Sequence, residues 1–106
     1  MSASDRLEGV AVVKRANVYF EGRCVSHTVF LPDGSRVSLG VILPSTLTFE
    51  TAAPEVMEIL AGRCRVQLAG SDATTDYGPG QRFAVPGESH FRIETIETLH
   101  YVCHFG

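Results

Sequence analysis

Cysteine and histidine are the side chains in this sequence most able to bind a metal ion or to act as a nucleophile. The chain has three cysteines, Cys24, Cys64 and Cys103, which are widely separated and include no C-x-x-C pair. An odd number of cysteines without that spacing favours neither a disulfide framework nor a zinc site. The sequence therefore predicts three free thiols that are buried as small hydrophobic side chains.

One short segment combines both residue types, because His100, Cys103 and His104 lie close together near the C-terminus. The segment is rich in strand-forming residues, and successive side chains of a strand point to opposite faces. His100 and His104 then share one face, whereas Cys103 lies on the other. A metal site is not expected at this cluster.

The elements that must position such side chains are predicted to be strands. Glycine and proline recur at short intervals and leave segments that are mostly too short for stable helices. The segments between them are rich in Val, Ile, Leu, Thr, Tyr and Phe, which favour strands. We predict strands at residues 18–30, 36–43, 46–51, 56–60, 63–68, 82–85, 91–96 and 99–105. Pro32-Asp33-Gly34 has the composition of a tight turn and predicts a hairpin.

Polar and apolar side chains alternate within these segments, as where Arg63 and Arg65 alternate with Cys64 and Val66. The predicted buried set is Cys64, Val66, Leu68, Val85, Ile93 and Val102, and the predicted exposed set is Arg63, Arg65 and Glu94. A small all-β chain with many antiparallel strands must hide its strand edges. We therefore predict one all-β domain, closed as an antiparallel β-barrel or jelly roll.

Residues 1–16 do not follow this pattern. Met1–Leu7 is polar, and the short apolar run Val10–Val13 follows it. We expect residues 1–16 to be an N-terminal arm or an added edge strand, and residues 17–106 to be the barrel domain.

Composition and charge exclude several classes of function. Of the 106 residues, 44% are hydrophobic, and nine Lys plus Arg against twelve Asp plus Glu give a formal net charge of -3. This sign disfavours nucleic-acid binding, which depends on positive charge. The longest aliphatic run, Val10–Val13, is far too short to span a membrane or to form the core of a signal peptide. We expect a folded, cytoplasmic protein with no membrane partner.

Two segments resemble the conserved motifs of the cupin superfamily. Gly80–Phe91 is similar to the second motif, with a glycine, a proline turn at Pro86 and then a strand. Glu55–Gly62 is similar to the end of the first motif, in which a metal-binding glutamate precedes a glycine. The resemblance implies a cupin-type antiparallel β-barrel.

The histidines that bind the metal in cupins are replaced in this chain. Their positions correspond to Phe49, Thr51 and Phe91, so that Glu55 is the one ligand position retained. A catalytic transition-metal site usually needs about three protein ligands or more, so the resemblance implies a cupin without a metal. His90, one residue out of register, is the alternative ligand, although alternation places it on the opposite face of its strand.

The chain also resembles one family within this superfamily. The similar segments are Asn17–Gly22, Leu39–Pro44, Leu47–Glu55, Met57–Gly62, Phe83–Pro86 and Tyr101–Phe105. Their order and spacing, together with the replaced histidines, resemble the pyrimidine/purine nucleoside phosphorylases. Members of that family split purine and pyrimidine nucleosides with phosphate, giving the free base and a pentose 1-phosphate.

The resemblance implies the same activity here, with nucleosides and phosphate as substrates and with no metal or other cofactor. It also implies a homodimer, because small cupin barrels often bury a sheet in a partner subunit. Whether the activity serves degradation or nucleotide salvage stays open. A non-catalytic small-molecule-binding cupin is the alternative, since a fold does not by itself define a function.

Phosphorolysis of an N-glycosidic bond needs a cradle for phosphate, a polar group for the ribose hydroxyls and a proton donor for the leaving base. Arg36 occupies a position that is basic in the family and is the candidate for the cradle, because a guanidinium presents paired donors to phosphate. Ser38 adds a hydroxyl on the same strand face, and Arg82 and His104 are second candidates. The alternative is that Arg36 is a solvated charge beside a turn.

Glu55 is the candidate for the acid or the ribose anchor. If the cupin alignment holds, its carboxyl points inward, and burial beside Phe49, Met57 and Phe91 would raise its pKa toward a useful range for a donor. The alternative is that Glu55 caps the first turn after Pro54 or pairs with an arginine at the rim.

Aromatic side chains are the candidates for stacking on the base, and they comprise Tyr19, Phe49, Phe83, Phe91 and Tyr101. Phe49 and Phe91 are favoured because they occupy cupin ligand positions, and Thr51 adds a hydroxyl. The candidate catalytic residues are thus Glu55 and Arg36. The candidate substrate-binding residues are Ser38, Phe49, Thr51, Met57, Phe83, Phe91, Tyr101 and His104.

Overall fold

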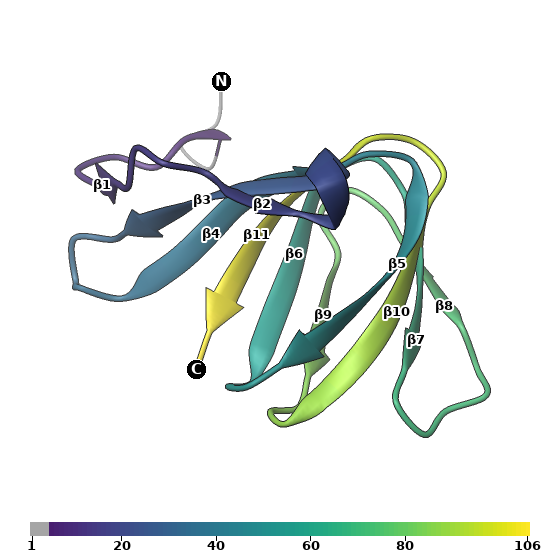
Figure 1. The fold of residues 1–106 in the computed structure, drawn as a ribbon. Coiled ribbons are helices and arrows are strands. Elements are labelled where there is room, and N and C mark those ends of the chain that lie inside the picture. Colours follow the sequence, from purple (N-terminus) through teal and green to yellow (C-terminus); the bar gives the residue numbers. More distant parts are fainter. Residues whose placement is uncertain (1–4) are drawn as a thin grey trace.

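Two antiparallel β-sheets face each other and hold the core between them (Figure 1). This computed structural model describes residues 5–106. The strands are β1 (Ala11–Val12), β2 (Asn17–Tyr19), β3 (Cys24–Phe30), β4 (Arg36–Ile42), β5 (Ser45–Thr51), β6 (Glu55–Ala61), β7 (Cys64–Leu68), β8 (Thr75–Tyr77), β9 (Arg82–Val85), β10 (Ser89–Thr95) and β11 (Leu99–Phe105). A short 3-10 turn at Phe20–Gly22 connects β2 to β3.

The larger sheet has the strand order β1-β3-β4-β11-β6-β9, and β2 pairs with the part of β3 that β1 leaves free. The smaller sheet has the order β5-β10-β7-β8. The all-β prediction is therefore confirmed, and β8 is a strand that the sequence analysis did not predict. The predicted closed barrel is not confirmed, because the described strands pair within two separate sheets. Side-chain packing across the core joins these sheets.

The core lies between the inner faces of the two sheets. Its largest fully buried side chains include Phe91, Ile42, Ile59, Ile93 and Leu99. Four predicted buried residues, Cys64, Val66, Val85 and Ile93, belong to this cluster. The prediction of free, buried thiols is confirmed for Cys24, Cys64 and Cys103. Alternation along each strand thus identified core positions correctly where a strand is covered along its length.

Two residues of the predicted buried set behave differently from the rest. Leu68 is 36% exposed, because it is the last residue of β7 and the exposed residues Ala69 and Gly70 follow it directly. Val102 is buried, but on the other face of β11, where it packs with Val29 in a second cluster. The outer face of the larger sheet therefore has its own apolar packing.

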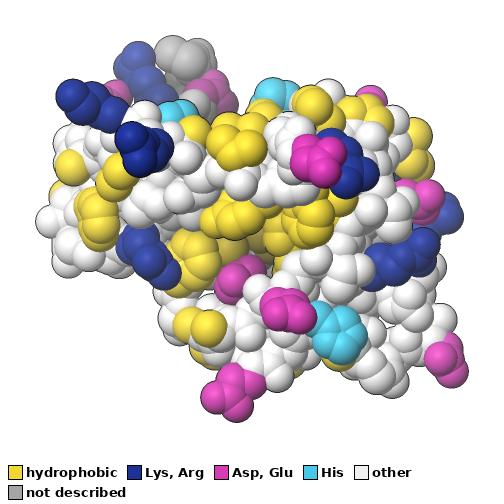
Figure 2. Space-filling view, viewed as in Figure 1, with side chains coloured by type: hydrophobic (Ala, Val, Ile, Leu, Met, Phe, Trp, Pro, Cys, Tyr) yellow, Lys and Arg dark blue, Asp and Glu magenta, His cyan; other side chains and the backbone are white. Residues whose placement is uncertain are grey.

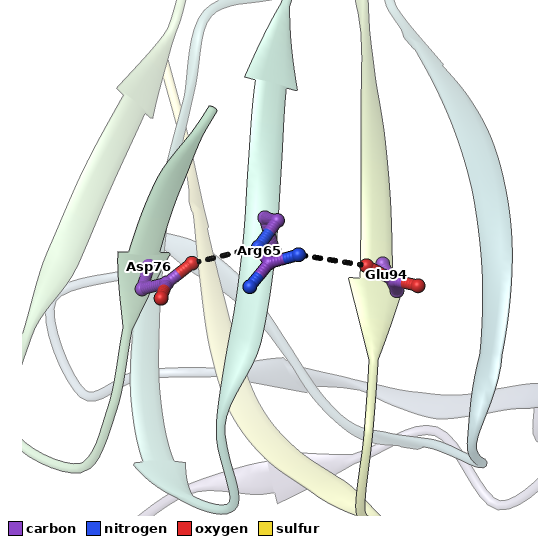
Figure 3. A network of polar contacts seen from close by, with 3 residues as sticks. All are labelled: Arg65, Asp76 and Glu94. Carbon is purple, nitrogen blue, oxygen red and sulfur yellow. Dashed lines mark hydrogen bonds and ion pairs between the residues drawn. The ribbon is translucent and has the colours of Figure 1, made fainter. Parts of the chain in front are cut away.

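The outer face of the smaller sheet is polar. Arg65 on β7 lies between Asp76 on β8 and Glu94 on β10, and it reaches both carboxylates (Figure 3). Its Nε lies 3.0 Å from Asp76 Oδ1, and its Nη1 lies 3.7 Å from Glu94 Oε1. Such exposed cross-strand pairs contribute little to stability but fix the face that each strand turns to solvent.

The N-terminal segment lies on the edge of the larger sheet. Ala11 pairs with Phe30 in the antiparallel ladder between β1 and β3. Of the predicted N-terminal arm or edge strand at residues 1–16, residues 1–4 lie outside the described part of the chain. Within residues 5–106, no helix is long and apolar enough to cross a membrane.

The strand predicted at residues 18–30 is interrupted, and this prediction is wrong in its first part. Phe20 and Glu21 have φ values of 53° and 59°, and Gly22 follows with φ of 95°. Three successive residues in the left-handed region reverse the chain, so that β2 folds back onto β3 as an antiparallel partner. The turn was missed because only Gly22 signals it in the sequence, and non-glycine residues seldom adopt this conformation.

Replacing Glu21 by glycine is expected to stabilise the protein. Glycine adopts a φ of 59° without steric cost, and its greater freedom in the unfolded chain offsets part of the gain. We expect the free energy of unfolding to rise by about 0.5 to 1 kcal/mol, measured by chemical denaturation. Glu97→Gly is the matched control, because Glu97 is exposed and has no positive φ. An equal loss of stability in both variants would contradict the prediction.

Candidate active site

A pocket of about 150 Å³ opens between the two sheets. Strands β2, β3, β4, β6 and β11 of the larger sheet line it on one side, and β5 and β10 of the smaller sheet line it on the other. Figure 2 shows a hollow at the centre of the visible face, with hydrophobic side chains gathered around it and acidic side chains below. The pocket is therefore mainly apolar with charged groups at its rim, as is typical of small-molecule sites.

The structure brings most of the predicted site residues into this pocket. The lining includes Glu55, Ser38, Phe49, Met57, Phe91 and Tyr101. Alternation explains this grouping, since each of them lies on the inner face of its strand. The remaining four candidates are not part of the lining: Arg36 lies beside the mouth against Phe105, and Thr51, Phe83 and His104 lie elsewhere.

Arg36 and Glu55 flank one aromatic ring at the mouth of the pocket. Glu55 on β6 is paired with Phe105 on β11, and Phe105 lines the pocket. On the other side of β11, the Arg36 Cζ atom lies 4.4 Å from the centroid of the Phe105 ring. The strand order β4-β11-β6 therefore places a cation and a carboxyl on either side of Phe105. Arg36 has no carboxylate within ion-pair distance among residues 5–106, so that its donors are free for an anion.

The carboxyl of Glu55 is half-buried and accepts a weak hydrogen bond from a thiol. Cys103 Sγ lies 3.5 Å from Glu55 Oε1. Burial raises the pKa of Glu55 above its ordinary value, and the hydrogen bond from Cys103 partly offsets this rise. Burial also raises the pKa of the Cys103 thiol, as does the neighbouring Glu55, while the charge of Arg36 lowers it. Cys103 therefore stays protonated and acts as a donor to Glu55.

Ser38 and Tyr101 lie deeper in the pocket. Ser38 is paired with Cys103, and Tyr101 is paired with Gly40, so that these side chains form successive rows on the inner face of the larger sheet. The Tyr101 hydroxyl lies over Gly40, where a Cβ atom would come within 2.7 Å of it. Burial raises the pKa of Tyr101, and its hydroxyl lies 3.4 Å from the Cys24 sulfur. Gly40 is thus required for the close approach of this ring.

Aromatic rings form the opposite wall of the pocket. Phe49 and Phe91 are adjacent on β5 and β10 and stack with their centroids 5.5 Å apart. Phe20 packs edge-on against Phe49, with centroids 5.2 Å apart. Phe49 is half-buried and Phe91 is fully buried. Both rings line the pocket, and the half-buried Phe49 presents the larger ring surface to it.

Three predicted binding residues do not line the pocket. The Thr51 hydroxyl donates to the Pro86 carbonyl at 2.7 Å and accepts from the Ser89 backbone N–H at 3.0 Å, so that it is committed to the backbone. Phe83 is buried behind Phe91, with ring centroids 5.7 Å apart. His104 lies on the outer face of its strand, where its Nε2 is 3.1 Å from Glu58 Oε1.

The other two polar candidates, Arg82 and His90, are exposed side chains that do not line the pocket. The exposure of His90 beside the buried Phe91 agrees with the predicted alternation on β10. Within residues 5–106, no group of three or more His, Cys, Asp and Glu side chains is placed to hold a metal ion. Glu55 is thus without the histidine partners of a cupin metal site.

The pocket also contains residues outside the final set of predicted catalytic and substrate-binding residues: Tyr19, Ser26, Ile42, Glu50, Cys103 and Phe105. Alternation from Tyr101 places Cys103 and Phe105 on its face, so this signal was present in the sequence. Glu50 is exposed and contributes to the rim of the pocket. Tyr19 was considered for stacking, but the turn that brings it to the pocket was not predicted.

Two facing antiparallel sheets around an apolar pocket define a cupin-like fold. The cupin domain of Cnp3 from Schizosaccharomyces pombe superimposes with a TM-score of 0.62 at 14% identity, over 87% of this chain and 69% of that chain. At this identity the likeness shows the fold alone.

The family follows from closer relatives. The model of the pyrimidine/purine nucleoside phosphorylase family matches residues 14–105. A protein of Methylococcus capsulatus named pyrimidine/purine nucleoside phosphorylase is 64% identical over 101 residues, which cover 95% of this chain and 98% of that protein. A crystal structure from Acinetobacter sp. ADP1, described as a protein of unknown function, has a TM-score of 0.93 and 52% identity over 95% of this chain and 98% of that chain. The chain belongs to the pyrimidine/purine nucleoside phosphorylase family, as the sequence predicted.

Proposed function

We propose that this protein is a nucleoside phosphorylase of broad specificity. It transfers the pentose of purine and pyrimidine nucleosides to phosphate, and the products are the free base and the pentose 1-phosphate. The observation that carries this proposal is the 64% identity to a protein named pyrimidine/purine nucleoside phosphorylase. The aligned residues cover 95% of this chain and 98% of that protein. The arrangement of the pocket supports the proposal, because it combines an apolar wall with a cation and a carboxyl at one rim.

The reaction exchanges one bond at the anomeric carbon for another. A phosphate oxygen forms a bond to this carbon while the bond to the base nitrogen breaks, and the electron pair of that bond leaves with the base. A proton must then reach the base, and positive charge on the ribosyl group must be stabilised in the transition state. The protein must hold phosphate and nucleoside in line for this exchange.

We assign the phosphate to Arg36. Its guanidinium carries paired donors and lies against the face of Phe105, which limits the directions in which the fork can point. Ser38 lies two residues further along the inner face of β4, and its hydroxyl points into the pocket. These two side chains form the proposed phosphate cradle.

We assign the proton donor to Glu55. Burial raises its pKa, and the thiol of Cys103 fixes Oε1, which leaves the other carboxyl oxygen to face the nucleoside. Glu55 lies on the far side of Phe105 from Arg36, so that a nucleoside in the pocket would have phosphate toward one side of this ring and the carboxyl toward the other. The same carboxyl is the alternative anchor for the ribose hydroxyls.

Broad specificity for the base follows from the apolar side chains that line the pocket. Phe49, Phe91 and Met57 give contact to either ring size, and they offer no hydrogen bond to a particular base edge. We leave Thr51, Phe83 and His104 out of the proposed site because each is engaged elsewhere. The Thr51 hydroxyl is bonded to the backbone, the Phe83 ring packs against Phe91, and His104 contacts Glu58 on the outer face of the sheet.

The test is phosphate-dependent release of base from inosine and from uridine, separated by chromatography. We expect both bases to be released, together with ribose 1-phosphate, and no release when phosphate is omitted. A non-catalytic binding protein would retain either nucleoside in equilibrium dialysis without splitting it. That outcome would replace the proposed function by the binding alternative.

Activity is expected to be independent of metal. Phe49, Thr51 and Phe91 occupy the positions of the cupin histidines, so Glu55 lacks the ligands that those positions supply in a cupin metal site. We expect phosphorolysis to be unchanged after dialysis against EDTA, and metal analysis of the active protein to give less than stoichiometric amounts of iron, zinc, manganese and nickel. Loss of activity on chelation, with recovery on addition of one metal, would contradict this and would make His90 the first ligand to examine.

We also propose that the protein works in the cytoplasm as a homodimer, in degradation or salvage of nucleosides. The outer face of the larger sheet supports the dimer, because Val25, Leu39, Val41 and Leu60 line a shallow apolar depression there. A partner subunit covering this face would leave the pocket on the inner face open.

A further inference from the structure

The turn at Phe20–Gly22 holds the end of β2 beside the pocket. Phe20 and Glu21 both have left-handed backbone conformations, with φ of 53° and 59°. Side-chain and backbone donors of Arg23 brace the turn, because its Nε and its N–H both donate to the Phe20 carbonyl, at 3.1 Å and 3.2 Å. A strained turn with this bracing keeps Tyr19, the residue before it, in one position.

The other residues of β2 determine the direction in which the Tyr19 side chain points. Asn17 Nδ2 donates to Ser26 Oγ at 3.4 Å and to Thr28 Oγ1 at 3.2 Å, which places the Asn17 side chain over β3. Val18 points the other way and is 61% exposed. Alternation returns Tyr19 to the side of Asn17, and its ring lines the pocket although it is 47% exposed.

An aromatic ring that is half exposed at a pocket mouth has an uncovered face. The ring of Phe20, by contrast, is used inside the protein, since it packs edge-on against Phe49 with centroids 5.2 Å apart. Tyr19 has no aromatic partner among the described residues. A flat ligand entering the pocket would cover this free surface.

We propose that Tyr19 is a specificity-determining residue, which stacks on the nucleobase and favours purines over pyrimidines. The inference rests on the proposed function, because it takes the ligand of this pocket to be a nucleoside. Stacking depends on overlap of the two ring faces, and a bicyclic purine offers more overlap than a pyrimidine. The contact is indifferent to the hydrogen-bonding edges of the base, which fits an enzyme that accepts both classes.

The experiment compares wild type, Tyr19→Leu, Tyr19→Phe and the control Val18→Ala. Val18 is the neighbouring exposed residue on the opposite face of β2, so its variant reports any general effect of altering this strand. Two quantities are measured for each protein: the KM for inosine and uridine at saturating phosphate, and the dissociation constants of hypoxanthine and uracil by calorimetry. The second quantity needs no catalysis.

For Tyr19→Leu we expect the KM for inosine and the dissociation constant of hypoxanthine to rise about ten-fold or more, with a smaller rise for uridine and uracil. The KM for phosphate stays unchanged, Tyr19→Phe behaves as wild type, and Val18→Ala changes neither quantity. Loss of stacking then appears as a shift of preference toward pyrimidines, which general damage to the fold would not produce.

The two proposals fail in different ways. If wild type releases base but Tyr19→Leu keeps the purine constants of wild type, the role of Tyr19 is wrong and the phosphorylase function stands. If wild type binds hypoxanthine without phosphorolysis, the function is wrong, and the calorimetric comparison alone decides on Tyr19. If wild type neither binds nor splits these compounds, both proposals are wrong.

Discussion

Replacing Glu55 by glutamine is expected to lower kcat for inosine and for uridine by about 100-fold or more. The amide keeps the shape of the side chain and its contact with Cys103, but it cannot deliver a proton to the leaving base. Both substrates should be affected alike, because every nucleoside leaves a base that needs neutralising. The KM values should change less than kcat, since the interaction that is lost belongs mainly to the transition state.

The stability of Glu55→Gln separates this role from a structural one. Burial raises the pKa of Glu55 in the folded state, so the contribution of this carboxyl to stability is fully present at pH values below its unfolded pKa. That contribution is lost as the pH rises through the folded pKa, and at neutral pH the ionised carboxylate costs stability. The variant should therefore unfold at the same temperature as wild type or at a higher one at neutral pH, although it is nearly inactive.

Two further measurements make the assignment of Glu55 falsifiable. In wild type, kcat should fall as the pH rises through the pKa of Glu55, because only the protonated form is an acid; a ribose anchor acting as a carboxylate would give the opposite slope. Glu50→Gln is the matched control, since Glu50 is exposed at the same rim, and it should retain most of the activity. Normal turnover in Glu55→Gln would show that another residue is the acid.

The inner positions of the strands were predictable from the sequence because they depend on local alternation. Phe49 and Phe91 lie at the predicted inward positions, and Glu55 lies on the inner face of β6. Each of these assignments needs only the strand and the direction of one side chain. The cupin-like motifs added the register between the two segments, and the structure places them around one pocket.

Other features of the pocket depend on contacts between distant segments, which no local pattern records. Arg36 and Glu55 lie on either side of Phe105 only because β11, the last strand, is inserted between β4 and β6. The hydroxyl of Thr51 faces inward as predicted, but the Pro86 carbonyl, 35 residues away in the sequence, occupies it. Tyr19 reaches the pocket through a left-handed turn at two non-glycine residues, a conformation that the sequence does not announce.

The position of Arg36 at the end of β4 allows its role in anion binding to be tested separately from stability. Arg36 is the exposed first residue of β4, and its guanidinium lies over the ring of Phe105. Its removal should therefore leave the core intact and change the unfolding temperature little. Any large effect on activity then reports on the anion that the guanidinium holds.

For Arg36→Ala we expect the KM for phosphate to rise and kcat to fall, with kcat/KM for phosphate lower by roughly ten- to a hundred-fold. A charge-assisted, paired contact to the attacking group is lost, and the nucleoside KM should move less because the base lies against the other wall of the pocket. Arg36→Lys should recover part of the loss, since it keeps the charge but not the planar fork. Arg82→Ala is the matched control, because Arg82 is also exposed but lies on the edge strand β9, away from the contact with Phe105, and it should behave as wild type. If Arg36→Ala keeps the phosphate dependence of wild type while Arg82→Ala loses it, the cradle lies outside this pocket, and the pairing of cation and carboxyl across Phe105 has no part in the reaction.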